Sequence, residues 1–577
     1  MNKISKKPLF RLFSYAFKHP LLIVLLILSA LVSVFCSLTS VILIGKAIDN
    51  ITDINAVLRK CALIGSLTLG YLFFEWLTET IASKITYLAV RDIKKQAFND
   101  LLKAKVGFID GMKSGDLIST MVVDIAEISD GLLLCFTQLF TGIFTILATI
   151  VIMMTMNYKI GLIVVCITPL SLILATFISK GTHKYFKKQS DLRGEISSKV
   201  KQATASAQVY KIFNYQQRAE DGFDAINEKL EKTSIKAIFF SSLPNPTTRF
   251  VNNIIYMLTA LIGALSIING GAFSLTVGTL TVFLTYAQKY AKPFNEISDV
   301  FTELESAATS FEKVARIFDC DKEEKDDDNA LVLTKGSKEI EFKDVSFSYV
   351  KEKPLIENLN VTAKKGQTVA IVGRTGSGKS TLINLLMRFY DVDDGQVLMD
   401  GNDIRELNRA SLRTSFGMVL QDSFVFTGTV RDNITFGRVA TDDEVWQAIK
   451  QAHAESFVKR LTGGLDTVIG ENVNLSEGQK QLICIARAML YIPDMIILDE
   501  ATSFVDVRTE VKIRKSFDKM AKGRTSFIVA HRLSTIEKAD LILVMDKGKI
   551  MEKGTHEELI KLNGLYTELY TSSFSHA

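Results

Sequence analysis

Long apolar stretches recur through the first 300 or so residues of this chain. About 20 residues of helix, rising ~1.5 Å each, cross the ~30 Å hydrocarbon core of a membrane, and a helix satisfies its own backbone hydrogen bonds there. The pattern therefore predicts six transmembrane helices. Their predicted positions are 20–45, 57–82, 131–156, 160–180, 250–269 and 274–292.

Basic residues are distributed unevenly among the segments between these spans. Lys and Arg cluster before the first span, between the second and third, and between the fourth and fifth, whereas the connections at 157–159 and 269–272 are short. Because positive charge is retained on the cytoplasmic side, we expect the N-terminus and the two long connections to be cytoplasmic. Their helical pattern predicts stalks that continue the spans into the cytosol.

The pattern changes after a charged segment at 321–328 that contains no apolar residue. Such a composition is typical of a solvated linker. Beyond it, short β-rich runs alternate with helical segments, as in an α/β domain. We therefore predict a membrane domain at 1–320, a linker at 321–338 and a second domain at 339–577.

Composition narrows the classes of function. Hydrophobic residues make up 47% of the chain, and the mean hydropathy is +0.21, in keeping with a membrane domain. The net charge is only +5, which does not indicate a nucleic-acid partner. The six cysteines are scattered without a C-x-x-C pair, so neither a metal site nor a disulfide framework is implied.

A nucleotide-binding motif follows a predicted buried strand at 368–372 and precedes a predicted helix at 381–389. Its sequence fits G-x-x-x-x-G-K-S, in which backbone N–H groups and a helix N-terminus cradle phosphates. We expect Lys379 to reach the β- and γ-phosphates of ATP and the Ser380 hydroxyl to ligate Mg²⁺. The residues expected to bind ATP here are Gly373, Arg374, Thr375, Gly376, Ser377, Gly378, Lys379, Ser380 and Thr381.

A second aliphatic run, at 495–498, ends in two carboxylates. At the end of a central strand, Asp499 is suited to hold Mg²⁺, directly or through water. The next carboxylate, Glu500, is suited to activate the attacking water as a general base. The two acids therefore predict ATP hydrolysis as well as ATP binding.

From about 340 to 569 the chain resembles the nucleotide-binding domain of ABC transporters, motif by motif. Tyr349 lies where the family stacks an aromatic ring on adenine, and Asp506 lies in a segment that matches the D-loop. Gln421 matches the glutamine that senses Mg²⁺ and the γ-phosphate, and His531 matches the switch histidine. The resemblance implies catalytic roles for Glu500, His531 and Gln421, and Mg²⁺ contacts for Ser380, Gln421 and Asp499.

Residues 475–479, Leu-Ser-Glu-Gly-Gln, match the family's signature loop. In this family ATP is sandwiched between the P-loop of one domain and the signature loop of another. The residues that the resemblance places against ATP in trans are Ser476, Glu477, Gly478 and Gln479. The expected fold class is therefore multidomain, with an all-α six-helix transmembrane domain followed by an α/β P-loop ABC ATPase domain.

Glu477 departs from the family, which usually has glycine at this position. The substitution adds a Cβ atom and a negative charge near the γ-phosphate, where like charges repel. The P-loop and the two carboxylates are intact. Family members with this asymmetry often pair with a different half-transporter, so we expect a heterodimer in which the partner supplies an intact signature loop. A homodimer that tolerates Glu477 is the alternative.

The N-terminal half resembles the exporter type of ABC transmembrane domain, with six spans and long stalks after spans two and four. Residues 108–117 resemble the family's first coupling helix, and 213–215 lie where the second falls. The resemblance implies ATP-driven export by alternating access, in what residue usage suggests is a bacterial plasma membrane. A soluble chromosome- or repair-type ATPase is excluded by the spans, and a gated channel is distinguished only by flux against a gradient.

The substrate is the least determined feature. Aliphatic and Phe-rich spans suit a lipophilic or amphipathic molecule, as in multidrug exporters, although lipid-facing spans have the same composition. Lipid export, peptide export and import through an exporter-like fold remain alternatives. Glu75 and Glu79, in the second predicted span, are functional candidates because acids within a membrane are costly, unless they lie at the water interface.

Overall fold

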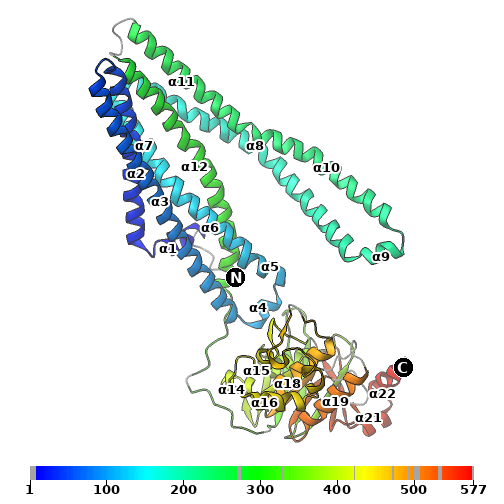
Figure 1. Ribbon diagram of the computed structural model, residues 1–577. Coiled ribbons are helices and arrows are strands. Elements are labelled where there is room, and N and C mark those ends of the chain that lie inside the picture. The colour runs from blue at the N-terminus through cyan, green and yellow to red at the C-terminus, as the bar shows by residue number, and fades with distance from the viewer. Residues whose placement is uncertain are drawn as a thin grey trace. The chain divides into compact units, whose positions relative to one another are not determined.

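The computed structural model (Figure 1) describes residues 8–268, 275–327, 329–336, 338–420, 423–470, 473–491, 493–499, 507–529 and 536–574. It divides into two compact units, which are described separately. The first comprises Met1–Lys103 and Met112–Cys320, and the second comprises Ala104–Gly111 and Asp321–Ala577. A short segment from between the second and third predicted spans thus belongs to the second unit.

The first unit is built of helices throughout the residues described. Within the described residues, helices run through each of the six segments that we predicted to span the membrane, namely α2, α3, α6–α7, α8, α11 and α12. The helical elements, with two π-helical turns η1 and η2, are α1 (Pro8–Ala16), α2 (Pro20–Asp49), α3 (Ile54–Leu102), α5 (Ser114–Ser119), η1 (Thr120–Asp124), α6 (Ile125–Leu134), η2 (Cys135–Leu139), α7 (Phe140–Met156), α8 (Tyr158–Ala205), α9 (Ala207–Ile212), α10 (Gln216–Ser242), α11 (Pro244–Ile268) and α12 (Val277–Phe318).

Four helical segments are long and apolar enough to cross a membrane: Pro20–Asp49, Ile54–Leu102, Ser114–Met156 and Pro246–Ile268. In the part of α8 whose side chains are described, the apolar stretch is Tyr158–Thr168. The described residues of α12 contain no stretch of that length and hydropathy, and Lys289 and Lys292 lie in its first half.

Two helices are much longer than a membrane is thick. Helix α3 has 49 residues and α8 has 48, which corresponds to about 70 Å each. Helix α10 runs back alongside α8, and α9 forms the tip between them, as Figure 1 shows. These lengths agree with the stalks expected from the sequence.

Helix α12 joins the two main apolar clusters of the first unit. Phe311 packs in one cluster with residues of α2, α3 and α6, and Phe283 packs in the other with residues of α2, α7 and α8. Near the end of α2 the backbones are close, because a Cβ atom on Gly278 would lie 2.0 Å from the carbonyl oxygen of Gly45. Glycine at this crossing lets α2 and α12 approach each other.

The second unit is an α/β domain with three sheets. Their strand orders are β2-β1-β4-β5, β12-β11-β3-β10-β9-β6 and β7-β8. The strands are β1 (Ile340–Phe347), β2 (Ile356–Ala363), β3 (Thr368–Gly373), β4 (Asp394–Met399), β5 (Asn402–Asp403), β6 (Phe416–Val419), β7 (Gly428–Thr429), β8 (Val468–Ile469), β9 (Met495–Asp499), β10 (Thr525–Val529), β11 (Leu541–Asp546) and β12 (Lys549–Gly554). The helices include α4 (Val106–Asp110), α13 (Lys379–Leu386), α14 (Arg409–Thr414), α15 (Val430–Thr435), α16 (Asp442–Gln451), α17 (Glu455–Val458), the 3₁₀ turn η3 (Gly464–Asp466), α18 (Glu477–Leu490), α19 (Val507–Ala521), α21 (His556–Leu562) and α22 (Leu565–Phe574).

The central strands of the six-stranded sheet set the position of the site. Strands β11, β3, β10, β9 and β6 are parallel, and Val529 of β10 pairs with Ile371 of β3 and with Asp499 of β9. Ligands of open α/β sheets bind at the carboxyl ends of parallel strands. The P-loop that follows β3 and the carboxylate that ends β9 therefore lie at the same edge.

The charged segment at 321–328 is not simply a solvated linker, and that expectation is corrected here. Glu323 pairs with Arg413 through contacts of 2.6 and 3.0 Å, and Asp326 pairs with Arg409 at 3.1 Å. The Arg413 guanidinium is the main cause of a lowered pKa at Glu323. The segment is thus attached to α14 by carboxylates that the sequence pattern assigned to solvent.

Candidate ATP-binding site

The P-loop connects β3 to α13 through two glycines that its geometry requires. Gly378 has φ +103° at the N-terminus of α13, a left-handed conformation that favours glycine. At Gly373, a Cβ atom would lie 2.2 Å from the carbonyl oxygen of Met545 in β11. Both positions therefore exclude a side chain, and the loop lies close against the sheet.

Lys379 is buried at the start of the helix, and its ammonium group turns back onto the loop. Its Nζ atom donates to the carbonyl oxygens of Gly373 and Arg374 at 2.8 and 3.1 Å. Burial lowers the pKa of Lys379, and the nearby charge of Asp499 opposes that shift. A buried cation of this kind beside phosphate-facing backbone N–H groups is suited to bind a polyphosphate.

The residues present fit a phosphate and a divalent cation. Among the described residues, the Ser377 hydroxyl is buried without a hydrogen-bond partner, and no side chain caps the N-terminus of α13. Donors of this kind favour an anion at a helix N-terminus. Ser380 is exposed one residue after Lys379, and Asp499 interacts electrostatically with Lys379. Ser380 and Asp499 are the described residues that would hold Mg²⁺.

Tyr349, the expected adenine-stacking residue, has a hydrogen-bonded hydroxyl group and a partly exposed side chain. Its hydroxyl lies 3.4 Å from the Thr381 hydroxyl and accepts a hydrogen bond from the Asn384 amide at 3.2 Å. Both partners belong to α13. The side chain of Tyr349 nevertheless remains 47% exposed, so a face of the ring is available for stacking.

Tyr390 links the aromatic group at the nucleotide site to helix α4. Its ring meets the Tyr349 ring edge-on, with centroids 5.0 Å apart, and its hydroxyl donates to the Asp110 carboxylate at 2.6 Å. Burial and the Asp110 carboxylate both raise the pKa of Tyr390, so the phenol keeps its proton. Contact with α4 is close, because a Cβ atom on Gly107 would lie 3.0 Å from the Tyr390 ring.

Several predicted site residues lie outside the described residues: Gln421, Glu500, Asp506 and His531. The strands that precede three of them are described. Strand β6 ends at Val419, β9 at Asp499 and β10 at Val529. The catalytic roles of these residues stay predictions.

The signature segment begins α18. The Ser476 hydroxyl accepts from the Gln479 N–H at 3.3 Å, and the Gln479 side chain accepts from the Ser476 N–H at 3.0 Å, which forms a capping box. Gly478 is buried, whereas Glu477 is exposed and pairs with Lys480 at 2.7 Å. Helix α18 packs on α15, α16, α19 and β6, whereas α13 packs on β3.

The P-loop residues and Tyr349 remain predicted site residues, whereas sequence reasoning did not single out Asn384 and Tyr390, which contact Tyr349. The available signal was weak, since Tyr390 only follows the P-loop helix as the second of two aromatic residues. Arg374, expected at the phosphates, pairs instead with Glu568 of α22 at 2.8 Å. Both side chains of that pair are 63% exposed, so the pairing leaves Arg374 accessible.

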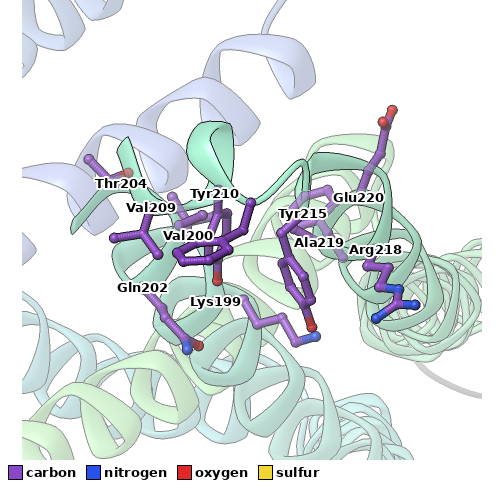
Figure 2. Close-up of a pocket in the computed structure, with 13 residues that line it drawn as sticks. Lys199, Val200, Gln202, Thr204, Val209, Tyr210, Tyr215, Arg218, Ala219 and Glu220 are labelled. Carbon is purple, nitrogen blue, oxygen red and sulfur yellow. The ribbon is translucent and has the colours of Figure 1, made fainter. Parts of the chain in front are cut away.

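A separate hollow of about 670 Å³ lies in the first unit, at the tip of the α8–α10 hairpin. Figure 2 shows Lys199 of α8, Tyr210 of α9 and Tyr215 gathered around it. The two tyrosine rings are 5.3 Å apart. Beside them Ile212 and Phe213 are about three-quarters exposed, which leaves the tip with an uncovered apolar surface.

Comparison with known proteins covers both halves of the chain. Residues 21–291 match the ABC transporter transmembrane region family, and residues 356–503 match the ABC transporter family. The chain is 36% identical, over 99% of its length and 95% of the relative, to the ABC transporter ATP-binding protein YfiC of Bacillus subtilis. It is 35% identical, over 90% of its length and 82% of the relative, to a fatty acid ABC transporter ATP-binding/permease protein of Mycobacterium bovis.

A solved structure agrees with both halves. A bacterial Atm1-family ABC exporter with ATP bound has a TM-score of 0.77 and 27% identity, covering 96% of this chain and 98% of that one. The similarity therefore extends through the helical unit and the α/β unit in one continuous order. The chain belongs to the ABC transporter family, as an exporter half-transporter whose transmembrane domain is fused to an ATP-hydrolysing domain that drives transport.

Proposed function

We propose that this half-transporter exports a lipophilic or amphipathic molecule of the multidrug type across a bacterial plasma membrane, as one half of a heterodimer. The observation that carries the pairing is the contrast within one ATPase domain. The P-loop has glycine at the position where a side chain would collide with β11, whereas the signature helix begins with the exposed carboxylate of Glu477. The composite site that uses this P-loop hydrolyses ATP, and the site that uses this signature loop binds ATP and turns over slowly.

In the hydrolysing site Lys379 binds the β- and γ-phosphates, and Ser380 and Asp499 hold Mg²⁺, which neutralises charge on the phosphates when bound. Glu500 accepts a proton from the attacking water, and Gln421 and His531 contact the γ-phosphate side. ATP binds the closed dimer more tightly than the open one, which is the condition for driving alternating access.

The tip of the α8–α10 hairpin supports a dimeric assembly. Val209, Ile212 and Phe213 are between 51% and 75% exposed there. Apolar surface of this kind marks a protein contact. We assign it to the ATPase domain of the second half-transporter, consistent with the position of the family's second coupling helix.

The substrate class is supported by composition and by one relative. The fatty acid named for the Mycobacterium bovis relative is an amphipathic molecule. Lipid export is therefore the best-supported alternative to multidrug export, and peptide export and import have less support. Transport into inverted vesicles against a gradient separates export from import and from a gated channel.

The first experiment is Mg²⁺-dependent ATP hydrolysis by the purified chain in lipid, with Glu500→Gln as the control. We expect little activity from the chain alone, and Glu500-dependent activity when a second half-transporter with an intact signature loop is co-expressed. Robust activity of the chain alone that Glu500→Gln abolishes would instead establish a working homodimer. Mg²⁺ titration in the same assay tests the cation requirement.

A further inference from the structure

A polar cavity lies among four helices of the first unit. It has a volume of about 520 Å³ and is enclosed by α2, α3, α12 and the η2–α7 segment. All four contributing segments fall within or beside predicted membrane spans. Charged side chains within a membrane are energetically costly and mark functional sites. The charged residues of this cavity are therefore candidates for a function.

Threonine hydroxyl groups of η2 and α7 line this cavity, and each donates its hydrogen to a backbone carbonyl oxygen of its own helix. Thr137, Thr141 and Thr145 each donate to the carbonyl oxygen four residues earlier, at 2.9, 2.7 and 2.7 Å. A hydroxyl that donates to its own helix keeps its oxygen lone pairs as acceptors. The threonine wall therefore offers acceptors to a bound molecule and favours a donor.

The two cations of the cavity are partnered within the described residues. Lys292 pairs with Glu296 at 3.2 Å, and the Lys289 ammonium donates to the Ser37 hydroxyl at 2.5 Å. With three glutamates and two lysines, the cavity carries a formal charge of −1.

The excess negative charge lies on α3. Glu75 and Glu79 are one helical turn apart, and neither forms an ion pair with a described residue. Tyr71, one turn earlier, and Lys289 both interact with Glu75 electrostatically. Glu79 also interacts electrostatically with Tyr71, and its side chain is exposed.

Apolar side chains complete the lining. Val34 and Leu38 come from α2, and Leu133 and Leu134 from the end of α6. A molecule that fits both parts has a hydrocarbon portion and a single positively charged donor. A carboxylate ligand would instead meet two glutamates and a row of acceptors, where like charges repel.

We propose that this cavity binds the protonated amine of an amphipathic cation, with Glu75 and Glu79 as its carboxylate ligands. The inference rests on the proposed export function and narrows its substrate class. The ammonium supplies the N–H donors that the acceptor wall lacks and neutralises the net charge of the cavity. Glu75 and Glu79 are then specificity-determining residues rather than side chains at a water interface.

The test is binding of three eight-carbon molecules to the full chain, with its partner half-transporter if one is required, in lipid nanodiscs. Octylamine, octanol and octanoate share a hydrocarbon chain and differ in charge. Isothermal titration near neutral pH, with empty nanodiscs subtracted, is expected to show octylamine binding about tenfold or more tightly than either analogue. Glu75→Gln and Glu79→Gln should remove that preference.

Glu305→Gln is the matched control, because Glu305 is an exposed carboxylate of α12 outside the cavity. Equal binding of the three molecules, a preference for octanoate, or an amine preference that survives both glutamate variants overturns the proposal. If Glu75→Gln does not fold, the exposed Glu79→Gln still decides the outcome. If the export function is correct, ATP-driven flux that depends on Glu500 is observed whichever of these binding results is obtained. Failure of the amine-binding proposal is therefore distinguishable from failure of the export proposal.

Discussion

The hydroxyl of Tyr390 lies 2.6 Å from a carboxylate oxygen of Asp110, and this hydrogen bond joins two segments 280 residues apart. On one side, the Tyr390 ring touches Tyr349, which is anchored to the P-loop helix through Thr381 and Asn384. On the other, Asp110 ends α4, which belongs to the segment between two predicted spans. Within the second unit, Tyr349 and α4 are thus connected by one ring and one hydrogen bond.

Removing that hydrogen bond should uncouple hydrolysis from transport. We expect Tyr390→Phe and Asp110→Asn to leave ATP affinity within about twofold, because the ring contact with Tyr349 is kept, and to lower the flux per ATP hydrolysed. A hydrogen bond to a charged group contributes about 1.5–3 kcal/mol when buried and less at this partly exposed site. Nucleotide titration and parallel flux and ATPase assays measure the two quantities.

Tyr570→Phe is the matched control for this prediction. It removes a phenol that donates to Glu537 at 2.7 Å, a tyrosine–carboxylate bond in the same unit that does not involve α4. If Tyr390→Phe and Tyr570→Phe have the same effect on flux per ATP, the contact with Asp110 has no coupling role.

Glu477→Gly should increase ATP hydrolysis by the chain alone. Removal of the carboxylate takes away both a like charge near the γ-phosphate and the Cβ atom. We expect kcat/KM to rise by about tenfold, equivalent to about 1.4 kcal/mol. Glu455→Gln, which disrupts a comparable exposed pair with Lys459, should have no effect. An unchanged rate in Glu477→Gly would mean that the signature loop tolerates glutamate.

Two glycine substitutions in the P-loop should differ in their cost to folding. In Gly373→Ala the new Cβ atom meets a backbone oxygen of β11 at 2.2 Å, whereas at Gly376 it meets no atom within 4 Å. Overpacking of this kind costs about 1–3 kcal/mol, in addition to lost ATP binding. Gly376→Ala has only its left-handed φ of +82° to accommodate, at about 1–2 kcal/mol. Thermal unfolding without nucleotide should rank Gly373→Ala as the less stable, and the opposite ranking would contradict the close approach of loop and sheet.

The stability of the ATPase domain should fall in mild acid through His453. His453 is exposed, but its partial desolvation, followed by the charges of Lys515, Lys519 and Lys512, lowers its pKa below the ordinary value of about 6.5. The folded state therefore prefers the neutral ring, so this contribution to stability is complete above pH 6.5 and is lost as the pH falls through the lowered pKa.

His453→Asn tests this dependence, because asparagine also accepts the left-handed φ of +54° found at this position. We expect the melting temperature of the variant to change less than that of the wild type between pH 7.5 and pH 5.5. Parallel melting curves over that range would assign the acid sensitivity to other groups.

Features that depend on contiguous residues could be predicted without the structure. The helices in the six segments, the lengths of α3 and α8, and the strand–loop–helix around Lys379 are local patterns, because helix formation and phosphate-binding loops depend on neighbours in the chain. Family membership followed from the same motifs and agrees with the comparisons.

The sequence by itself thus determined the class of the protein, the order of its domains and the strand–loop–helix that carries Lys379. The tertiary structure decided which distant residues meet: Tyr390 with Asp110, the linker carboxylates with α14, and Glu75 with Lys289 across one cavity. The physical reason is that such contacts are set by how helices and strands cross and pack, and no local period along the chain records which side chain lies opposite which.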